Sequence, residues 1–129
     1  MGFVMKMSTF AVVHARGNVP NFIGDPLIHC YAGKQLVLAY VSRQALMDYF
    51  RIPGDKHVTV QQWNLVVDRN LDAFKRIIED KFDRDDWDVH NSYGQSYPKL
   101  VVTLEDMRHS GEKFTIKVLG LDAGFWRRA

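Results

Sequence analysis

The chain has 129 residues, of which 47% are hydrophobic and 25% charged, as expected for one folded domain with a sizeable core. Its 17 basic and 15 acidic residues give a formal net charge of +2, which excludes the large charge excess of a polyelectrolyte-binding protein. The single cysteine, Cys30, excludes an intramolecular disulfide and favours a reducing compartment.

The N-terminal region is expected to add a first or edge strand at Ser8–Arg16. Its apolar stretch Phe10–Val13 is shorter than the apolar core of a signal peptide, which has about 7–15 residues. Elsewhere, no run approaches the ~20 apolar residues of a membrane span. We therefore expect a cytoplasmic protein that makes no contact with a membrane.

Two β-rich runs come next. Leu27–Tyr31 and Gln35–Val41 flank the short link Ala32-Gly33-Lys34, and this arrangement predicts a hairpin. The second run is apolar on both of its alternating faces, which is typical of a central strand covered on both sides.

Helical signals follow the hairpin. Ser42 is a candidate N-cap for a short helix at Arg43–Phe50. Thr59 starts a longer pattern, and Gln62 completes a capping box with it. Apolar residues then recur at spacings of three and four, which predicts one uninterrupted amphipathic helix over Thr59–Arg84. This apolar stripe consists of Val60, Trp63, Val67, Leu71, Phe74 and Ile78.

The C-terminal third is expected to contain two more strands. The predicted elements are a loop at Asp86–Pro98, a strand at Lys99–Leu104, a turn at Met107–Glu112, a strand at Lys113–Leu119 and a tail at Gly120–Ala129. The two strands are rich in β-branched and alternating apolar residues, so we expect them to pair as an antiparallel hairpin. In the second strand Phe114, Ile116 and Val118 are expected to point inward and Lys113, Thr115 and Lys117 to face water.

The element order β-β-α-α-β-β, with room for the extra N-terminal strand, predicts an α+β fold. We expect a small, mostly antiparallel sheet with the long helix packed across one face. Residues 1–129 are expected to form a single domain. Residues 1–9 and 120–129 are expected to be flexible or partner-docking termini.

Four short motifs resemble one known family. They are Val41–Leu46 (VSRQAL), Asp72–Ile77 (DAFKRI), Asp80–Arg84 (DKFDR) and the acidic pair Glu105-Asp106. Over roughly Leu27–Met107 the chain resembles the DUF1488 family, which consists of small bacterial proteins of unknown function. The resemblance implies a strand pair, a short helix, a long helix and a final strand. It brings no reaction, cofactor or catalytic residue with it.

Residue spacing gives little support for metal or nucleophile chemistry. The candidate ligands are His14, His29, Cys30, His57, His90 and His109. They show no C-x-x-C or H-x-x-x-H spacing, and the neighbours His29 and Cys30 would point to opposite faces of a strand. A lone cysteine in an apolar strand is more often a core residue than a nucleophile. We predict no metal, no cofactor and no catalytic residue.

An acidic cluster ends the long predicted helix. It comprises Glu79, Asp80, Asp83, Asp85, Asp86 and Asp88. Counted from Asp83, the positions at which a calcium loop needs Gly and Glu hold Asp88 and Gly94. The cluster therefore predicts a solvated helix terminus. Because negative charge opposes the helix dipole there, we expect Lys81 and Arg84 to neutralise part of it.

The favoured function is that of a binding or accessory module acting through protein association, with a protein partner or as a homodimer. Aromatic residues often anchor interfaces, and the tail residues Phe125, Trp126, Arg127 and Arg128 are the candidates for such contacts. The same tail could instead cover its own sheet.

Two alternatives remain. One is a small ligand-binding protein or enzyme whose pocket is assembled from His29, Cys30, Tyr40 and His57. The other, less favoured, is a weak nucleic-acid binder that uses the basic, aromatic tail for stacking.

Overall fold

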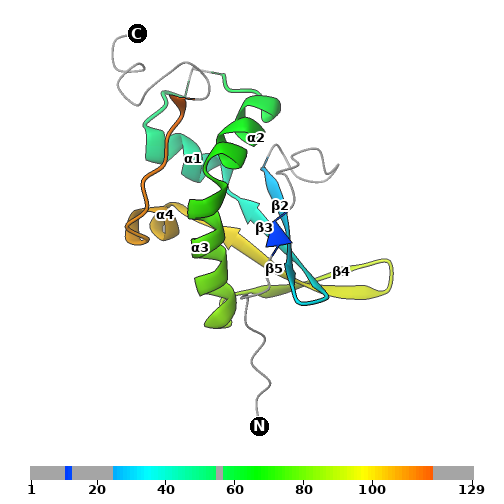
Figure 1. The fold of residues 1–129 in the computed structure, drawn as a ribbon. Coiled ribbons are helices and arrows are strands. Elements are labelled where there is room, and N and C mark those ends of the chain that lie inside the picture. The colour runs from blue at the N-terminus through cyan, green and yellow to red at the C-terminus, as the bar shows by residue number, and fades with distance from the viewer. Residues whose placement is uncertain (1–10, 13–24, 55–56, 118–129) are drawn as a thin grey trace.

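The computed structural model describes residues 11–12, 25–54 and 57–117 of the chain. Within them the elements are β1 (Ala11–Val12), β2 (Leu27–Ala32), β3 (Gln35–Val41), α1 (Arg43–Phe50), α2 (Val60–Arg69), α3 (Leu71–Asp83), β4 (Asp88–Ser92), β5 (Gln95–Val102) and α4 (Leu104–His109) (Figure 1). The predicted α+β class is confirmed. In the described part of the chain, no helix is long and apolar enough to cross a membrane.

The described strands form one sheet in the order β1-β2-β3-β5-β4. β2 and β3 form the predicted antiparallel hairpin, and β4 and β5 are also antiparallel. Only β3 and β5 run parallel among the described strands. The connection between them passes through α1, α2, α3 and β4, because parallel neighbours need a crossover rather than a tight turn.

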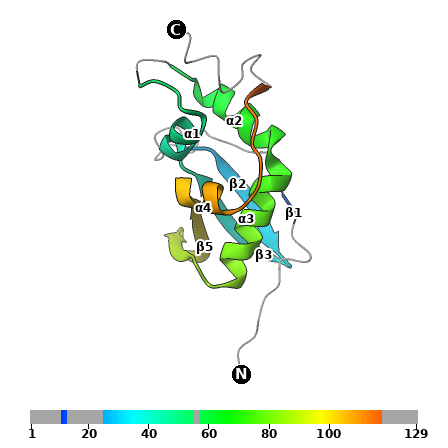
Figure 2. The same cartoon turned by 90° about the vertical axis from the view of Figure 1, so that its left-hand side faces the viewer.

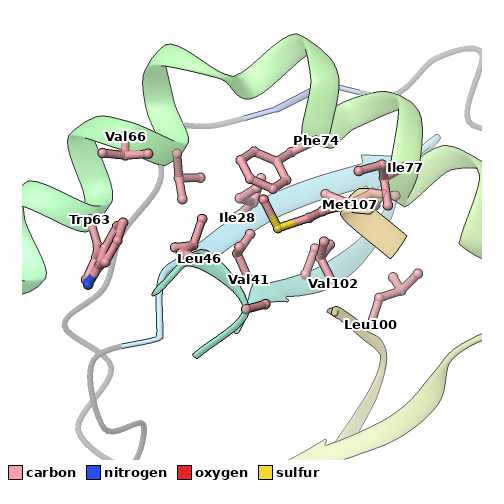
Figure 3. Close-up of a cluster of buried hydrophobic side chains, with 14 of the residues drawn as sticks. Ile28, Val41, Leu46, Trp63, Val66, Phe74, Ile77, Leu100, Val102 and Met107 are labelled. Carbon is pink, nitrogen blue, oxygen red and sulfur yellow. The ribbon is translucent and has the colours of Figure 1, made fainter. Parts of the chain in front are cut away.

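The helices cover one face of the sheet (Figure 2). Alternate residues of β2, β3 and β5, among them Ile28, Val41 and Val102, point into a core with Trp63 and Phe74 from the helices (Figure 3). On the opposite face of the sheet, Leu27, Leu38 and Tyr40 form a second buried cluster. Strand β3 is therefore central and buried on both faces, as predicted.

The prediction of one long helix over Thr59–Arg84 is wrong, because the chain forms two helices that meet at Asn70. The Thr59 capping box is present, but the backbone of Asn70 leaves helical geometry (φ −106°, ψ 22°). The Asn70 side chain, 7% exposed, donates from Nδ2 to the carbonyls of Val66 (2.7 Å) and Thr115 (2.9 Å). Its Oδ1 accepts from the Thr115 N–H at 3.0 Å. Asparagine favours such side-chain bonds over helix continuation.

The predicted loop at Asp86–Pro98 is also wrong, because it forms β4 and the first half of β5. Tyr93 and Gly94 both have positive φ, 51° and 76°. They form a two-residue turn between the paired residues Ser92 and Gln95, which is the geometry that hairpins prefer.

The predicted turn and strand after β5 are corrected too. The turn assigned to Met107–Glu112 begins inside α4, which Thr103 and Asp106 start with a capping box. The described part of Lys113–Leu119 is not a strand. Instead, residues 110–117, here called the return segment, run back along α3. Phe114 packs on Phe74 with ring centroids 4.8 Å apart. The predicted alternation is still visible there, because Ile116 is buried and Lys117 is exposed.

Of the predicted N-terminal strand Ser8–Arg16, the described part is β1, which pairs antiparallel with β2. The proposed termini 1–9 and 120–129 lie outside the described residues.

Replacing Asn70 by alanine removes the hydrogen bonds that join the helix junction to the return segment. Buried groups left without a partner each cost about 1–3 kcal/mol, so we expect Asn70→Ala to lower the free energy of unfolding by that amount or more. Urea denaturation measures this loss. Gln61→Ala, at an exposed position of α2, is the control and should change stability by less than about 0.5 kcal/mol. Equal effects of the two variants would contradict the role given to Asn70.

Candidate functional site

The helices α3 and α4 are joined by a buried lysine. Lys81, on the last turn of α3, is 6% exposed. Its Nζ lies 2.8 Å from Oδ2 of Asp106 and 3.0 Å from Oδ2 of Asp86. Asp106 also accepts the backbone N–H of Thr103 at 2.9 Å, so one carboxylate both caps α4 and holds the lysine. A buried amine needs such paired, hydrogen-bonded partners.

Arg84, the C-cap residue of α3, extends the same ion-pair network. Its Nε lies 3.1 Å from Oδ2 of Asp80, and its Nη2 lies 3.8 Å from Asp86 and 3.9 Å from Asp106. The prediction that Lys81 and Arg84 neutralise part of the acidic cluster is therefore confirmed.

A further ion pair joins α3 to the return segment. Arg76 donates from Nε and Nη2 to the two carboxylate oxygens of Glu112, at 2.9 and 2.7 Å. This fork-to-fork geometry fixes direction as well as distance. The return segment is thus tied to α3 at Arg76, in addition to its contacts at Phe74 and Asn70.

Helices α3 and α4 and the return segment surround an open pocket of about 510 Å³, here called the α3–α4 pocket. Ile77 is its only aliphatic lining residue among those described. The lining residues are Arg76, Ile77, Asp80, Arg84, Asp86, Glu105, Asp106, His109, Ser110 and Glu112. Five carboxylates face two guanidinium groups, and Lys81 adds one positive charge against two of those carboxylates. The pocket therefore carries a surplus of two negative charges, although the whole chain has a net charge of +2.

Three charged groups of the pocket, Asp106, Glu112 and Arg76, have pKa values shifted in the direction that favours their charged forms. Burial opposes ionisation of Asp106, but hydrogen bonds from Lys81 and Thr103 outweigh it, so the pKa of Asp106 lies below its usual value. The hydrogen bond from Arg76 lowers the pKa of Glu112, and the reciprocal bond raises the pKa of Arg76. All three shifts move the pKa values away from neutral pH.

A second, smaller hollow of about 320 Å³ shares the lining residue Asp86 with the α3–α4 pocket. Its lining residues are Asp85, Asp86, Trp87, Asp88, Lys99 and Val101. Over the described residues, no group of three or more His, Cys, Asp and Glu side chains is arranged to hold a metal ion.

The residues predicted to line a pocket do not line either of these hollows. Cys30 is fully buried in the core beneath the helices, and burial raises the pKa of its thiol. His29 and Tyr40 lie on the opposite face of the sheet, where Tyr40 is buried and burial raises its pKa. His57 is exposed in the connection before α2. The tail candidates Phe125, Trp126, Arg127 and Arg128 lie outside the described residues.

Sequence reasoning identified one half of the α3–α4 pocket and missed the other. Asp80, Asp86 and Arg84 belong to the acidic cluster already singled out. Glu112 was missed and Asp106 was named only within a family motif, because each is more than 20 residues from its partner on α3. The usable signal was the capping box Thr103–Asp106, which marks the start of α4.

The lowered pKa of Asp106 predicts a pH-dependent stability. Its ionised carboxylate contributes fully above the unfolded-state pKa of about 3.9, and this contribution is lost as the pH falls through the lower pKa of the folded state. We expect Asp106→Asn to reduce the free energy of unfolding by about 1–3 kcal/mol at pH 7, and the difference from the unmodified protein to shrink below about pH 4.

Urea denaturation at pH 7 and pH 3 measures this effect. Asp83→Asn is the matched control, because Asp83 is an exposed α3 residue outside the pocket lining. A loss in Asp106→Asn that is the same at both pH values would contradict the assignment.

Comparison with known proteins finds no match to the chain among family models, curated proteins or solved structures. The resemblance to DUF1488 therefore stays a prediction.

Proposed function

We propose that this protein is a cytoplasmic binding module that associates with a partner protein, and that the α3–α4 pocket accepts a cationic segment of that partner. The observation that carries the proposal is the negative charge surplus of this 510 Å³ pocket. Arginine or lysine side chains of a partner would meet carboxylates already fixed in place by Lys81, Arg76 and Arg84. Complementary charge of this kind favours encounter and specificity.

Glu105 is the pocket carboxylate best placed to bind a new cation. It is exposed on the first turn of α4 and lines the pocket. The ion pairs of the described residues involve the other four lining carboxylates but not Glu105. A cation that approaches Glu105 therefore displaces no existing partner.

The lining argues against a small apolar ligand. Sites for drug-sized molecules are predominantly apolar with a few polar groups, whereas Ile77 alone supplies aliphatic surface here among the described residues. The alternative of an enzyme is less well supported, because the shifted pKa values of Asp106, Glu112 and Arg76 all stabilise charged forms. Nucleic acid is disfavoured at this site because phosphates would meet a carboxylate surplus.

Three of the four motifs that resemble DUF1488 also meet at this pocket. The motif residues that line it are Arg76, Ile77, Asp80, Arg84, Glu105 and Asp106. We propose that the chain belongs to this bacterial family and that these three motifs serve one surface, whereas Val41–Leu46 contributes to the core.

Binding of a model cation tests the proposal. The probe is an acetylated, amidated pentapeptide with two arginines, titrated into the labelled protein at low salt while backbone amide NMR shifts are followed. We expect shifts confined to α3, α4 and the return segment. Since exposed ion pairs contribute about 0.2–1 kcal/mol, we expect Glu105→Gln to weaken binding by roughly 1.5- to 5-fold.

The controls separate this pocket from general attraction. The same peptide with glutamine in place of arginine should not bind, and Asp83→Asn, which removes an equal charge from α3 outside the pocket, should leave the affinity unchanged. Equal weakening by Glu105→Gln and Asp83→Asn, or shifts spread over the whole surface, would contradict the proposal.

A further inference from the structure

Strand β4 forms one edge of the described sheet, with β5 on its inner side and no described strand on its outer side. The β4–β5 hairpin extends beyond the helices (Figure 1). Val89, the second residue of β4, is 57% exposed. An edge strand presents unpaired backbone groups that can template pairing with another chain.

The register of the hairpin identifies which backbone groups face outward. Val89 lies opposite Pro98, which has no N–H, so Val89 and Pro98 form a pair without mutual hydrogen bonds. Because hydrogen-bonded and non-bonded pairs alternate along antiparallel strands, Asn91 is also in a non-bonded pair. The N–H and C=O groups of Val89 and Asn91 therefore point away from β5.

A second copy of β4 can meet these groups about a two-fold axis in three antiparallel registers, centred on Val89, His90 or Asn91. Registers centred between two residues would place outward groups opposite inward ones, and those centred on Asp88 or Ser92 would pair only the first or last residue of β4. The register centred on His90 sets two histidines opposite each other and Val89 opposite Asn91. The register centred on Asn91 sets Val89 opposite Tyr93, which belongs to the turn.

The register centred on Val89 is the one with complementary side chains. It places the exposed Asp88 of each copy opposite His90 of the other, so that two carboxylate–imidazole pairs form. It also covers the exposed Val89 with Val89 of the other copy. Hydrogen-bonded polar pairs and apolar pairs across strands are stabilising, whereas like charges directly opposite are destabilising.

We propose that two copies of this protein associate through antiparallel pairing of their β4 strands, with Val89 opposite Val89 and Asp88 opposite His90. The two sheets then continue into one. A two-fold contact of this kind is self-complementary and closes as a dimer. The surface is separate from the α3–α4 pocket, so the proposal does not depend on binding of a cationic partner.

Sedimentation velocity over a range of concentrations tests the association. We expect the unmodified protein to shift from monomer to dimer as concentration rises, and Val89→Lys to weaken this association at least about tenfold, because two ammonium groups would face each other on the axis. Leu65→Lys, at a position of α2 that is 51% exposed, should leave the association unchanged. A monomer at every concentration, or a dimer that Val89→Lys leaves intact, would overturn the proposal.

A cysteine scan tests the register independently of affinity. Val89→Cys, His90→Cys and Asn91→Cys are each oxidised at a concentration where the dimer is populated, and the unmodified protein, whose Cys30 is fully buried, is the control. Only the residue on the two-fold axis has its own copy directly opposite, within reach of a disulfide. We expect Val89→Cys to form the covalent dimer fastest. Preferential cross-linking of His90→Cys or Asn91→Cys would refute the register.

Discussion

The contact on which the rest of the structure depends is the pair of hydrogen bonds between the Asn70 side chain and the backbone of Thr115. Helix α2 ends and helix α3 begins at Asn70. The same hydrogen bonds anchor the return segment near its C-terminal end, at Thr115. From there the return segment runs antiparallel to α3, meeting Phe74 through Phe114 and Arg76 through Glu112. One wall of the pocket therefore depends on a single amide at a helix junction.

The features predicted correctly are those whose cause is local in the sequence. Gly33, with φ 64°, permits the tight turn between β2 and β3. The hydroxyl groups of Ser42 and Thr59 each satisfy an N–H three residues further on. Apolar residues on both faces of β3 identified it as central. None of these inferences needed knowledge of a partner elsewhere in the chain.

The wrong predictions concern segments whose conformation depends on residues far away in the sequence. The apolar period continues across Asn70 through Val67, Leu71 and Phe74, so the sequence pattern alone favours one helix. The break depends on Thr115, 45 residues away. In the return segment, the alternation of Phe114 and Ile116 correctly predicted which side chains face inward. It did not reveal that the inner side packs on helices instead of pairing with a strand.

The pocket and the β4 edge are connected by one short turn after α3. Asp85 adopts positive φ, 58°, a conformation that aspartate tolerates better than most residues. Asp86 then turns back to Lys81, while the ring of Trp87 stacks on Phe82 with centroids 5.9 Å apart. The indole Nε1 of Trp87 is buried and has no hydrogen-bond partner among the described residues, a cost that the packing of the ring must outweigh.

Because Asp86 faces the pocket and Asp88 begins β4, the position of this turn sets both surfaces at once. A change in Trp87 or Phe82 would move the carboxylate of one surface and the first residue of the other together. Glu105 and Val89 lie outside this turn, on the first turn of α4 and at the second residue of β4. Changes at these two residues can therefore alter one surface without the other, which makes charge at the pocket and pairing at the sheet edge separable properties of the same fold.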